Sequence, residues 1–283
     1  MPDSRPIGVF DSGVGGLTVA RAVLDLLPNE PIVYVGDSAR YPYGPRPLEE
    51  IRRFALEIAG DLVNRYVKML VVACNSVEVA AIADVAAAHD TPVVGVVDPG
   101  ARAAVAATRN GRIGVIGTEA TVASRAYDRA VLPMAALARD LGHAPFGGDG
   151  FRVELFSEAC PVFVEAVERG DTSSKELQEA AFEYLQPLKE AEVDTLILGC
   201  THYPLLSGLI SVVMGPGVVL ISSAEETAKD VYAALLRDDL LRRDPSPPEH
   251  VFLTTGDPAA FQRLGQRFLG PEIATVGETR PWS

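Results

Sequence analysis

Two of the three cysteines of this chain stand at matching positions in two similar segments. Cys74 follows the mostly apolar run 67–73, Cys200 follows the mostly apolar run 193–199, and polar residues come directly after each. In an α/β domain such a run is typical of a buried parallel strand, whose carboxyl end carries side chains to the ligand-binding edge of the sheet. If both cysteines face one substrate, they supply one acid/base for each of its faces.

The surroundings of the two cysteines favour a chemical role over a structural one. Cys74 precedes a helix that we expect to begin near Ser76, and the amide groups and dipole of a helix start favour a thiolate, which lowers the pKa from about 8.5. Cys200 stands at the corresponding position of the second segment, and Thr201 and His202 follow it. A single buried cysteine is most often a small apolar core residue, but that explains two cysteines in register poorly.

Two further groups of residues follow the first two strands. Asp11 and Ser12 end the first apolar run, and the glycines after them are spaced G-x-G-G, unlike a dinucleotide-binding turn, so a cofactor site has weak support. Asp11 could cap a tight turn, or it could face the same crevice as Cys74 as an acid. The loop 41–44, Tyr-Pro-Tyr-Gly, lies on the same edge and could close over a ligand or merely pack.

The cysteines and histidines do not form a metal-binding pattern. His202 is the only histidine within a motif, no C-x-x-C pair occurs, and Cys160 precedes Pro161 in an unrelated stretch. We therefore expect no metal site and a structural Cys160.

Strand and helix patterns alternate along the whole chain, which predicts doubly wound parallel sheets. The expected strands lie at 7–10, 32–35, around 70, 93–97 and 218–221, and one more lies between 250 and 268. The expected helices lie at 17–27, 48–65, 76–88, from about 205, at 223–240, and within 250–268, with a turn at 98–100.

A second repeated motif suggests an internal duplication. Ile-Gly-Val-Phe-Asp-Ser at residue 7 is echoed by Ile-Gly-Val-Ile-Gly-Thr at residue 113, an offset of 106 residues, and the cysteine segments are offset by 126. The difference of about 20 residues predicts an insertion, which we place mostly at 134–151 as a surface or interface elaboration.

We therefore expect an α/β fold of two pseudo-symmetric, doubly wound parallel-sheet domains with the active site in the cleft between them. The first domain takes residues 1–98 with 208–283 and carries Asp11 and Cys74. The second takes 99–207 and carries Cys200.

Composition excludes several classes of protein. The formal net charge is -13 over 283 residues, which opposes general binding to nucleic acid or to an anionic membrane surface. No run approaches the roughly 20 apolar residues of a membrane span, and the opening residues lack the pattern of a signal peptide. We expect a cytoplasmic protein without a disulfide framework, because three cysteines are few and odd in number.

Five motifs together resemble glutamate racemase, a member of the cofactor-independent aspartate/glutamate racemase family. The resemblance extends from residue 7 to about residue 228. Its motifs are Ile7-Gly-Val-Phe-Asp-Ser-Gly-Val-Gly-Gly16, Tyr34-Val-Gly-Asp37, Tyr41-Pro-Tyr-Gly44, Ala73-Cys-Asn75 and Leu198-Gly-Cys-Thr-His-Tyr-Pro-Leu205.

The resemblance implies racemisation of glutamate by two cysteines without pyridoxal phosphate or another cofactor. Cys74 would take the α-proton of D-glutamate and Cys200 that of L-glutamate. Asp11 and His202 would handle protons behind the two sulfurs, and Glu168 would have a related role unless it is a surface charge at a helix end. The implied substrate-binding set is Asp11, Ser12, Tyr43, Gly44, Asn75, Ser76, Thr201 and His202.

One residue departs from the pattern of the family. Glu78 stands in the first turn of the helix after Cys74, where relatives commonly have small residues. We expect its side chain to point outward, because a carboxylate facing Cys74 would raise the pKa of the thiol at a cost of about 1.4 kcal/mol per unit.

The resemblance also carries expectations about partners. D-Glutamate would feed peptidoglycan synthesis, the protein would form a homodimer, and direct contact with DNA gyrase is conceivable because some relatives inhibit that enzyme. The alternatives are racemisation of aspartate or another amino acid on the same scaffold, and a regulatory protein that binds gyrase.

Overall fold

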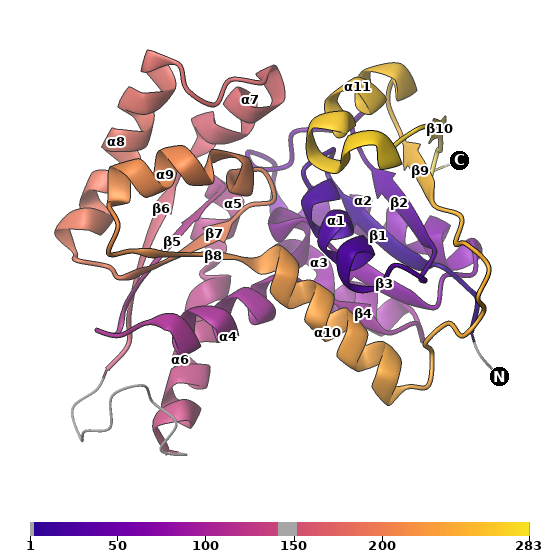
Figure 1. The fold of residues 1–283 in the computed structure, drawn as a ribbon, viewed down its shortest axis with the longest axis horizontal. Coiled ribbons are helices and arrows are strands. Elements are labelled where there is room, and N and C mark those ends of the chain that lie inside the picture. The colour runs from indigo at the N-terminus through magenta and orange to yellow at the C-terminus, as the bar shows by residue number, and fades with distance from the viewer. Residues whose placement is uncertain (1–2, 141–151, 283) are drawn as a thin grey trace. The chain divides into compact units, whose positions relative to one another are not determined.

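The chain folds into two compact units, each with its own parallel sheet (Figure 1). This computed structural model describes residues 3–140 and 152–282. The first unit comprises Met1–Val96 and Ala224–Ser283, and the second comprises Val97–Ser223. The prediction of two parallel-sheet α/β domains is confirmed.

The first unit is built on a six-stranded parallel sheet in the order β10-β9-β2-β1-β3-β4. Its elements are β1 (Ile7–Asp11), α1 (Leu17–Leu26), β2 (Ile32–Gly36), α2 (Leu48–Asn64), β3 (Met69–Val72), α3 (Asn75–Ala88), β4 (Val93–Val94), α10 (Ser223–Arg237), β9 (Val251–Thr254), α11 (Pro258–Leu269), the 3-10 helix η2 (Gly270–Glu272) and β10 (Val276–Glu278).

The apolar runs of the sequence become the central strands of this sheet. Every residue of β1, β2 and β3 is buried, as expected for strands covered on both faces. Helix α2 packs against α3, and α1 packs against α11. The carboxyl ends of β1, β2 and β3 thus lead from a rigid core into the turns that carry Asp11, Asp37 and Cys74.

The second unit is built on a four-stranded parallel sheet in the order β6-β5-β7-β8. Its elements are α4 (Val97–Ala107), β5 (Arg112–Gly117), α5 (Glu119–Ser124), α6 (Ala126–Asp140), β6 (Glu154–Ala159), α7 (Pro161–Arg169), α8 (Lys175–Glu190), β7 (Thr195–Gly199), the 3-10 helix η1 (Tyr203–Leu206), α9 (Ser207–Met214) and β8 (Val219–Ser222).

The two sheets share one strand order, which accounts for the repeated motifs. In both units the first strand lies between the second and the third, and the fourth lies outside the third. The motif at residue 7 forms β1 and its echo at residue 113 forms β5. The two cysteine segments form β3 and β7, so Cys74 and Cys200 follow equivalent strands.

Most of the extra length of the second unit lies between its first two strands. The sheet registers pair Ile7 with Ile32, 25 residues later, but Ile113 with Leu155, 42 residues later. Helix α6 takes up part of this difference and includes residues 134–140 of the predicted insertion. Residues 141–151 lie outside the described part of the chain.

The predicted boundary at 207/208 is wrong by about sixteen residues. Strand β8 pairs with β7, so residues 208–223 belong to the second unit, and the chain returns to the first at Ser223 and Ala224. The predicted turn at 98–100 is also wrong, because α4 begins at Val97 and includes Pro99. Proline is tolerated there because the first turn of a helix needs no amide donor.

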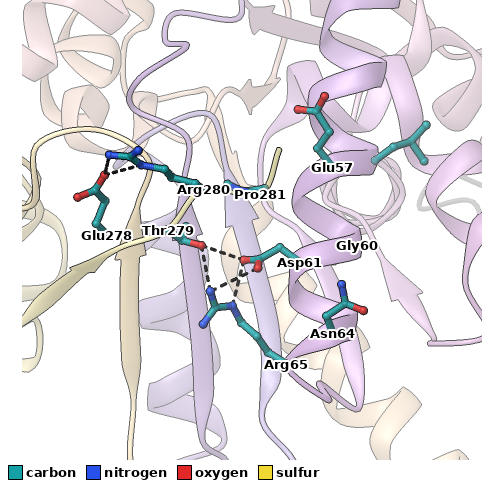
Figure 2. A pocket seen from close by; sticks show the side chains of 10 residues that line it. Glu57, Gly60, Asp61, Asn64, Arg65, Glu278, Thr279, Arg280 and Pro281 are labelled. Carbon is teal, nitrogen blue, oxygen red and sulfur yellow. Dashed lines mark hydrogen bonds and ion pairs between the residues drawn. The ribbon is translucent and has the colours of Figure 1, made fainter. Parts of the chain in front are cut away.

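Strand β10 has no counterpart among the predicted elements, and its three residues pair with β9. Next to it, a hollow of about 570 Å³ separates α2 from the segment that follows β10 (Figure 2). None of the site residues expected from the sequence lines this hollow.

Within residues 3–140 and 152–282, no helix combines the length and the apolar character needed to cross a membrane. The same residues contain no cluster of three or more His, Cys, Asp or Glu side chains that could hold a metal ion.

Candidate active site

Cys74 is a buried thiol at the start of a helix. It occupies the N-cap position of α3 with an extended backbone, and its exposed fraction is 6%. Its Sγ lies 3.6 Å from Oγ of Ser12, which follows β1, the neighbouring strand. The structure thus brings Cys74 and Ser12 together, as the adjacent strand ends predict.

The expected lowering of the Cys74 pKa is wrong. Burial raises the pKa of this thiol, and the charge of Asp11 raises it further. The amide of Val77 and the hydroxyl and amide of Ser12 act in the opposite direction, but they do not outweigh the loss of hydration. Cys74 therefore holds its proton at neutral pH in the free protein.

Asp11 is fully buried and organises the turn that follows β1. Its Oδ1 accepts a hydrogen bond of 2.8 Å from the backbone N–H of Gly13. A Cβ at Gly16 would stand 2.5 Å from Cβ of Asp11, so this glycine allows the turn to close over the aspartate. The G-x-G-G spacing thus serves the packing of Asp11, which also lies close enough to Cys74 to act on its pKa.

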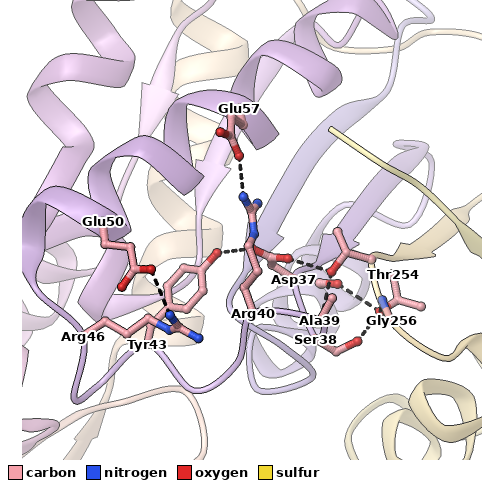
Figure 3. Close-up of polar contacts among 12 residues, drawn as sticks. Asp37, Ser38, Ala39, Arg40, Tyr43, Arg46, Glu50, Glu57, Thr254 and Gly256 are labelled. Carbon is pink, nitrogen blue, oxygen red and sulfur yellow. Dashed lines mark hydrogen bonds and ion pairs between the residues drawn. The ribbon is translucent and has the colours of Figure 1, made fainter. Parts of the chain in front are cut away.

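Tyr43 is buried, and its hydroxyl is held within the protein. It donates to Oδ2 of Asp37, the residue after β2 (Figure 3). The Tyr43 ring lies 5.5 Å from that of Phe54 on α2. Burial and the carboxylate raise the pKa of Tyr43, and a charge on Cys74 would raise it further. Gly44 is half-buried in the turn that follows. The loop 41–44 is thus anchored at Tyr43, on the side of the sheet that carries Cys74.

The residues after Cys74 form the first turn of α3, and one of them corrects an expectation. Asn75 and Ser76 are both buried, and their binding role remains a prediction. Glu78 does not point outward: it is 7% exposed, and its Oε2 accepts a hydrogen bond of 2.5 Å from N–H of Val96. The expectation failed because it weighed only repulsion from the thiolate. A buried amide donor near the end of the first unit offers the carboxylate a partner.

Cys200 follows β7 as Cys74 follows β3. It is 7% exposed, and the neighbouring Thr201 and His202 are also buried. Sγ of Cys200 lies 3.8 Å from Nδ1 of His202, within hydrogen-bonding distance for sulfur. The imidazole is therefore placed to exchange a proton with this thiol.

Glu168 completes a line of three groups. Its Oε1 lies 3.1 Å from Nε2 of His202, and its side chain is 22% exposed. A carboxylate in this position suits a proton on Nε2, an arrangement that would leave the lone pair of Nδ1 facing Cys200. Glu168 therefore contacts the imidazole next to Cys200, and its part in handling protons remains a prediction.

The position of Glu168 follows from the packing of α7 on the turn after Cys200. Helix α7 begins with Pro161 and ends at Arg169, and it is capped by Gly170, whose φ is +79°. The ring of Phe163 lies 5.4 Å from that of Tyr203, in an edge-to-face arrangement. The Tyr203 hydroxyl lies 3.0 and 2.9 Å from the carbonyl oxygens of Gly117 and Cys160, so it ties η1 to the ends of β5 and β6.

Cys160 lies nearer to the site than its sequence context indicated. It directly follows β6, at the same edge of the sheet as Cys200, and it is fully buried. Burial raises the pKa of Cys160, and the charges of Glu158 and Cys200 raise it further. A structural role for this cysteine remains a prediction.

Sequence reasoning passed over several polar residues at these strand ends. Thr118 follows β5 as Ser12 follows β1, and its Oγ1 lies 3.0 Å from that of Thr121 while it accepts the Thr121 amide at 3.2 Å. The echo of the motif at residue 113 could have identified it. Asp37, which the sequence indicated only as part of the motif 34–37, accepts the hydrogen bond of the Tyr43 hydroxyl.

Two doubly wound units, each with a buried cysteine after its third strand, define the class of α/β protein to which this chain belongs. A model of the Asp/Glu/Hydantoin racemase family matches residues 16–231. The glutamate racemase of Parafrankia sp. (strain EAN1pec) is 58% identical over 273 residues, which are 96% of this chain and 93% of that protein. The glutamate racemase of Mycobacterium tuberculosis (strain ATCC 25618 / H37Rv) is 55% identical over 277 residues, which are 98% and 96% of the two chains.

A solved structure is similar over the same length. Glutamate racemase from Francisella tularensis in complex with D-glutamate is 34% identical, covers 99% of both chains and gives a TM-score of 0.88. The chain belongs to the Asp/Glu/Hydantoin racemase family and is an isomerase. The resemblance based on its motifs is thereby confirmed.

Proposed function

We propose that this protein interconverts L- and D-glutamate, with Cys74 and Cys200 as the two acid/base groups. The observation that carries the proposal is their placement after the equivalent strands β3 and β7, each buried beside polar partners. Relatives more than half identical over nearly the whole chain are glutamate racemases. The solved relative with bound D-glutamate supports this choice of substrate.

Racemisation at an α-carbon requires one group to remove a proton and another to return one from the opposite face. A thiolate takes the α-proton of the bound amino acid, and a planar carbanion forms. The second cysteine, as a thiol, gives its proton to the other face, so the two cysteines leave the turnover with their states exchanged. We assign removal of the proton from D-glutamate to Cys74 and from L-glutamate to Cys200.

The environments of the two cysteines support different roles for them in the resting protein, with Cys74 as the acid and Cys200 as the base. Cys74 keeps its proton because of burial and Asp11, so it is ready to act as the acid. Cys200 can pass its proton to Nδ1 of His202, whose Nε2 is held by Glu168. In this state the protein is prepared to convert L-glutamate into D-glutamate.

The remaining residues of the expected set would bind the substrate and stabilise charge. The hydroxyls of Ser12, Ser76 and Thr201 can donate to carboxylate oxygens, and Asn75, Gly44 and Tyr43 complete the expected set. Because the α-proton is barely acidic, most of the barrier must fall through such fixed donors and through positioning. This scheme needs no cofactor.

The choice of substrate is tested by comparing amino acids with the purified protein. Optical rotation should be lost rapidly with either enantiomer of glutamate and at least about a hundredfold more slowly with aspartate. A site whose donors are spaced for the two carboxylates of glutamate loses a polar contact when the shorter aspartate is bound. Faster turnover of aspartate would contradict the assignment.

Assembly and cellular role remain predictions attached to this function. The product would supply peptidoglycan synthesis in the cytoplasm, and we expect a homodimer, which sedimentation velocity would detect. A contact with DNA gyrase, if made, should pass through protein surfaces and not through DNA, because the net charge of the chain is -13.

A further inference from the structure

The guanidinium group of Arg40 joins two parts of the first unit that are far apart in sequence. Its central carbon lies 4.0 Å from the ring centroid of Phe54 on α2 and 4.3 Å from that of Trp282. The Arg40 side chain is only 16% exposed. A cation held over aromatic rings away from water is stabilised by about 0.5–2 kcal/mol.

The nitrogens of Arg40 face two carboxylates. Nε donates to Oδ2 of Asp37 at 2.6 Å, and Nη1 donates to Glu57 (Figure 3). Nη2 is buried and has no hydrogen-bond partner among the described residues, so the polar contacts alone do not hold the group. The aromatic contacts therefore contribute to the orientation of Arg40.

Asp37 links Arg40 to the loop 41–44 through its carboxylate. The residue is fully buried, and its carboxylate accepts hydrogen bonds from the Tyr43 hydroxyl and, at 2.6 Å, from the Thr255 hydroxyl. Its backbone N–H donates to the carbonyl of Asp11 at 3.0 Å. A shift of Arg40 must therefore change the balance of charge around the carboxylate that holds Tyr43.

Trp282 reaches Arg40 from the segment 279–282, which follows β10. This segment is fastened at its other end by Thr279, whose hydroxyl lies 3.1 Å from Asp61 and 2.9 Å from Arg65. The hollow of about 570 Å³ lies alongside residues 278–281 (Figure 2). Trp282 is 45% exposed, and its ring packs on the guanidinium of Arg40.

We propose that Arg40 and Trp282 are positioning residues for substrate binding: Trp282 fixes Arg40, Arg40 fixes Asp37, and Asp37 fixes Tyr43. This rests on the proposed function, in which the loop with Tyr43 and Gly44 contacts glutamate. The coupling is reciprocal, so bound glutamate also strengthens the contact of Trp282 with Arg40. Trp282 is the single tryptophan of the chain and is therefore its own fluorescent reporter.

The first test measures the kinetics of Trp282→Ala, Trp282→Phe and Arg40→Lys, with folding checked by circular dichroism. The alanine and lysine variants should raise KM for glutamate about 3- to 10-fold with kcat within about twofold, because loss of the stacked contact weakens a preorganised loop. Trp282→Phe keeps a ring and should restore most of the affinity. Leu26→Ala, on α1 and 46% exposed, is the matched control and should leave KM unchanged.

The second test follows Trp282 emission during titration with D-glutamate. The wild-type emission should change and saturate at the concentration that saturates the enzyme, and Arg40→Lys should lose most of this response. An active wild type with an unresponsive Trp282, or a Trp282→Ala variant that loses thermal stability but keeps its KM, would overturn the coupling alone. A wild type that does not racemise glutamate would overturn the proposed function and this inference with it.

Discussion

Glu168 and His202, 34 residues apart in the sequence, meet at 3.1 Å between Oε1 and Nε2. On the other side of the ring, Nδ1 lies 3.8 Å from Sγ of Cys200. The imidazole thus lies between a carboxylate and the cysteine, with one ring nitrogen facing each of them. Cys74 has a different arrangement, with a buried carboxylate, Asp11, that opposes loss of its proton.

Replacing Glu168 by glutamine should impair the Cys200 side of the reaction. The amide can donate as well as accept, so the tautomer of His202 is no longer fixed. We expect kcat to fall about 10- to 100-fold in both directions with KM little changed, because the equilibrium constant of a racemisation is one and a variant cannot alter it. Glu165→Gln is the control, because Glu165 lies on the same helix with its side chain 73% exposed. Equal rates for the two variants would refute a role for Glu168.

The charge of Asp11 should control the reactivity of Cys74. Because Asp11 raises the pKa of the thiol, Asp11→Asn lowers that pKa and increases the thiolate fraction at any pH below it. The asparagine can still accept the Gly13 N–H. Alkylation of Cys74 by iodoacetamide, followed by mass spectrometry between pH 7 and about 10, should be slow in the wild type and faster in the variant.

The control for this experiment is Asp25→Asn, which removes a carboxylate 66% exposed on α1. It should leave the alkylation profile of Cys74 unchanged. An Asp11→Asn variant that reacts more slowly than the wild type would show that the sign of the interaction is wrong.

Glu78 and Gly95 should be energetically coupled. A Cβ at Gly95 would overlap the Glu78 carboxylate, which is held by the Val96 amide. Gly95→Ala should therefore cost about 1–3 kcal/mol of unfolding free energy in the wild type and less in a Glu78→Ala background. Urea denaturation of the four proteins of this cycle measures the coupling. Strict additivity of the two substitutions would contradict the contact.

The buried pair of Lys68 and Glu30 should be a major determinant of the stability of the first unit. Nζ of Lys68 lies 2.5 Å from Oε2 of Glu30 and donates to the carbonyl oxygens of Asp3 and Leu240. Lys68→Met leaves the buried carboxylate without its cation, while Oε1 still accepts the Arg242 N–H, so we expect a loss of about 3–5 kcal/mol in urea denaturation.

Lys175→Met is the matched control, because Lys175 is 84% exposed and its pair with Glu179 lies in water. It should change stability by less than about 0.5 kcal/mol. Similar losses in the two variants would mean that the buried pair contributes no more than a surface pair.

The fold could be predicted from the sequence because parallel strands buried on both faces leave long apolar runs. Strands β1, β3, β5 and β7 carried the two repeated motifs, and these placed Cys74 and Cys200 in equivalent positions. Strand β8 was assigned to the wrong sheet, because its apolar run suits either sheet. Only its pairing with β7 shows that it belongs to the second sheet. The three residues of β10 are too few to give a pattern.

The contacts of the site depended on information that local sequence does not contain. Glu78 turned inward because Val96, 18 residues away, offers a buried amide. The pKa of Cys74 rose because burial outweighs the helix start, and burial is set by the whole unit. Likewise, Trp282 meets Arg40 only because β9 and β10 extend the first sheet beyond β2.

The central claim, that two cysteines racemise glutamate, is tested most directly by isotope exchange in deuterated water. Starting from L-glutamate, the wild type should form D-glutamate with solvent deuterium at the α-carbon, and Cys74→Ala and Cys200→Ala should each lose inversion by at least about a thousandfold. Inversion at the wild-type rate in either variant, or D-glutamate without solvent deuterium, would contradict the account.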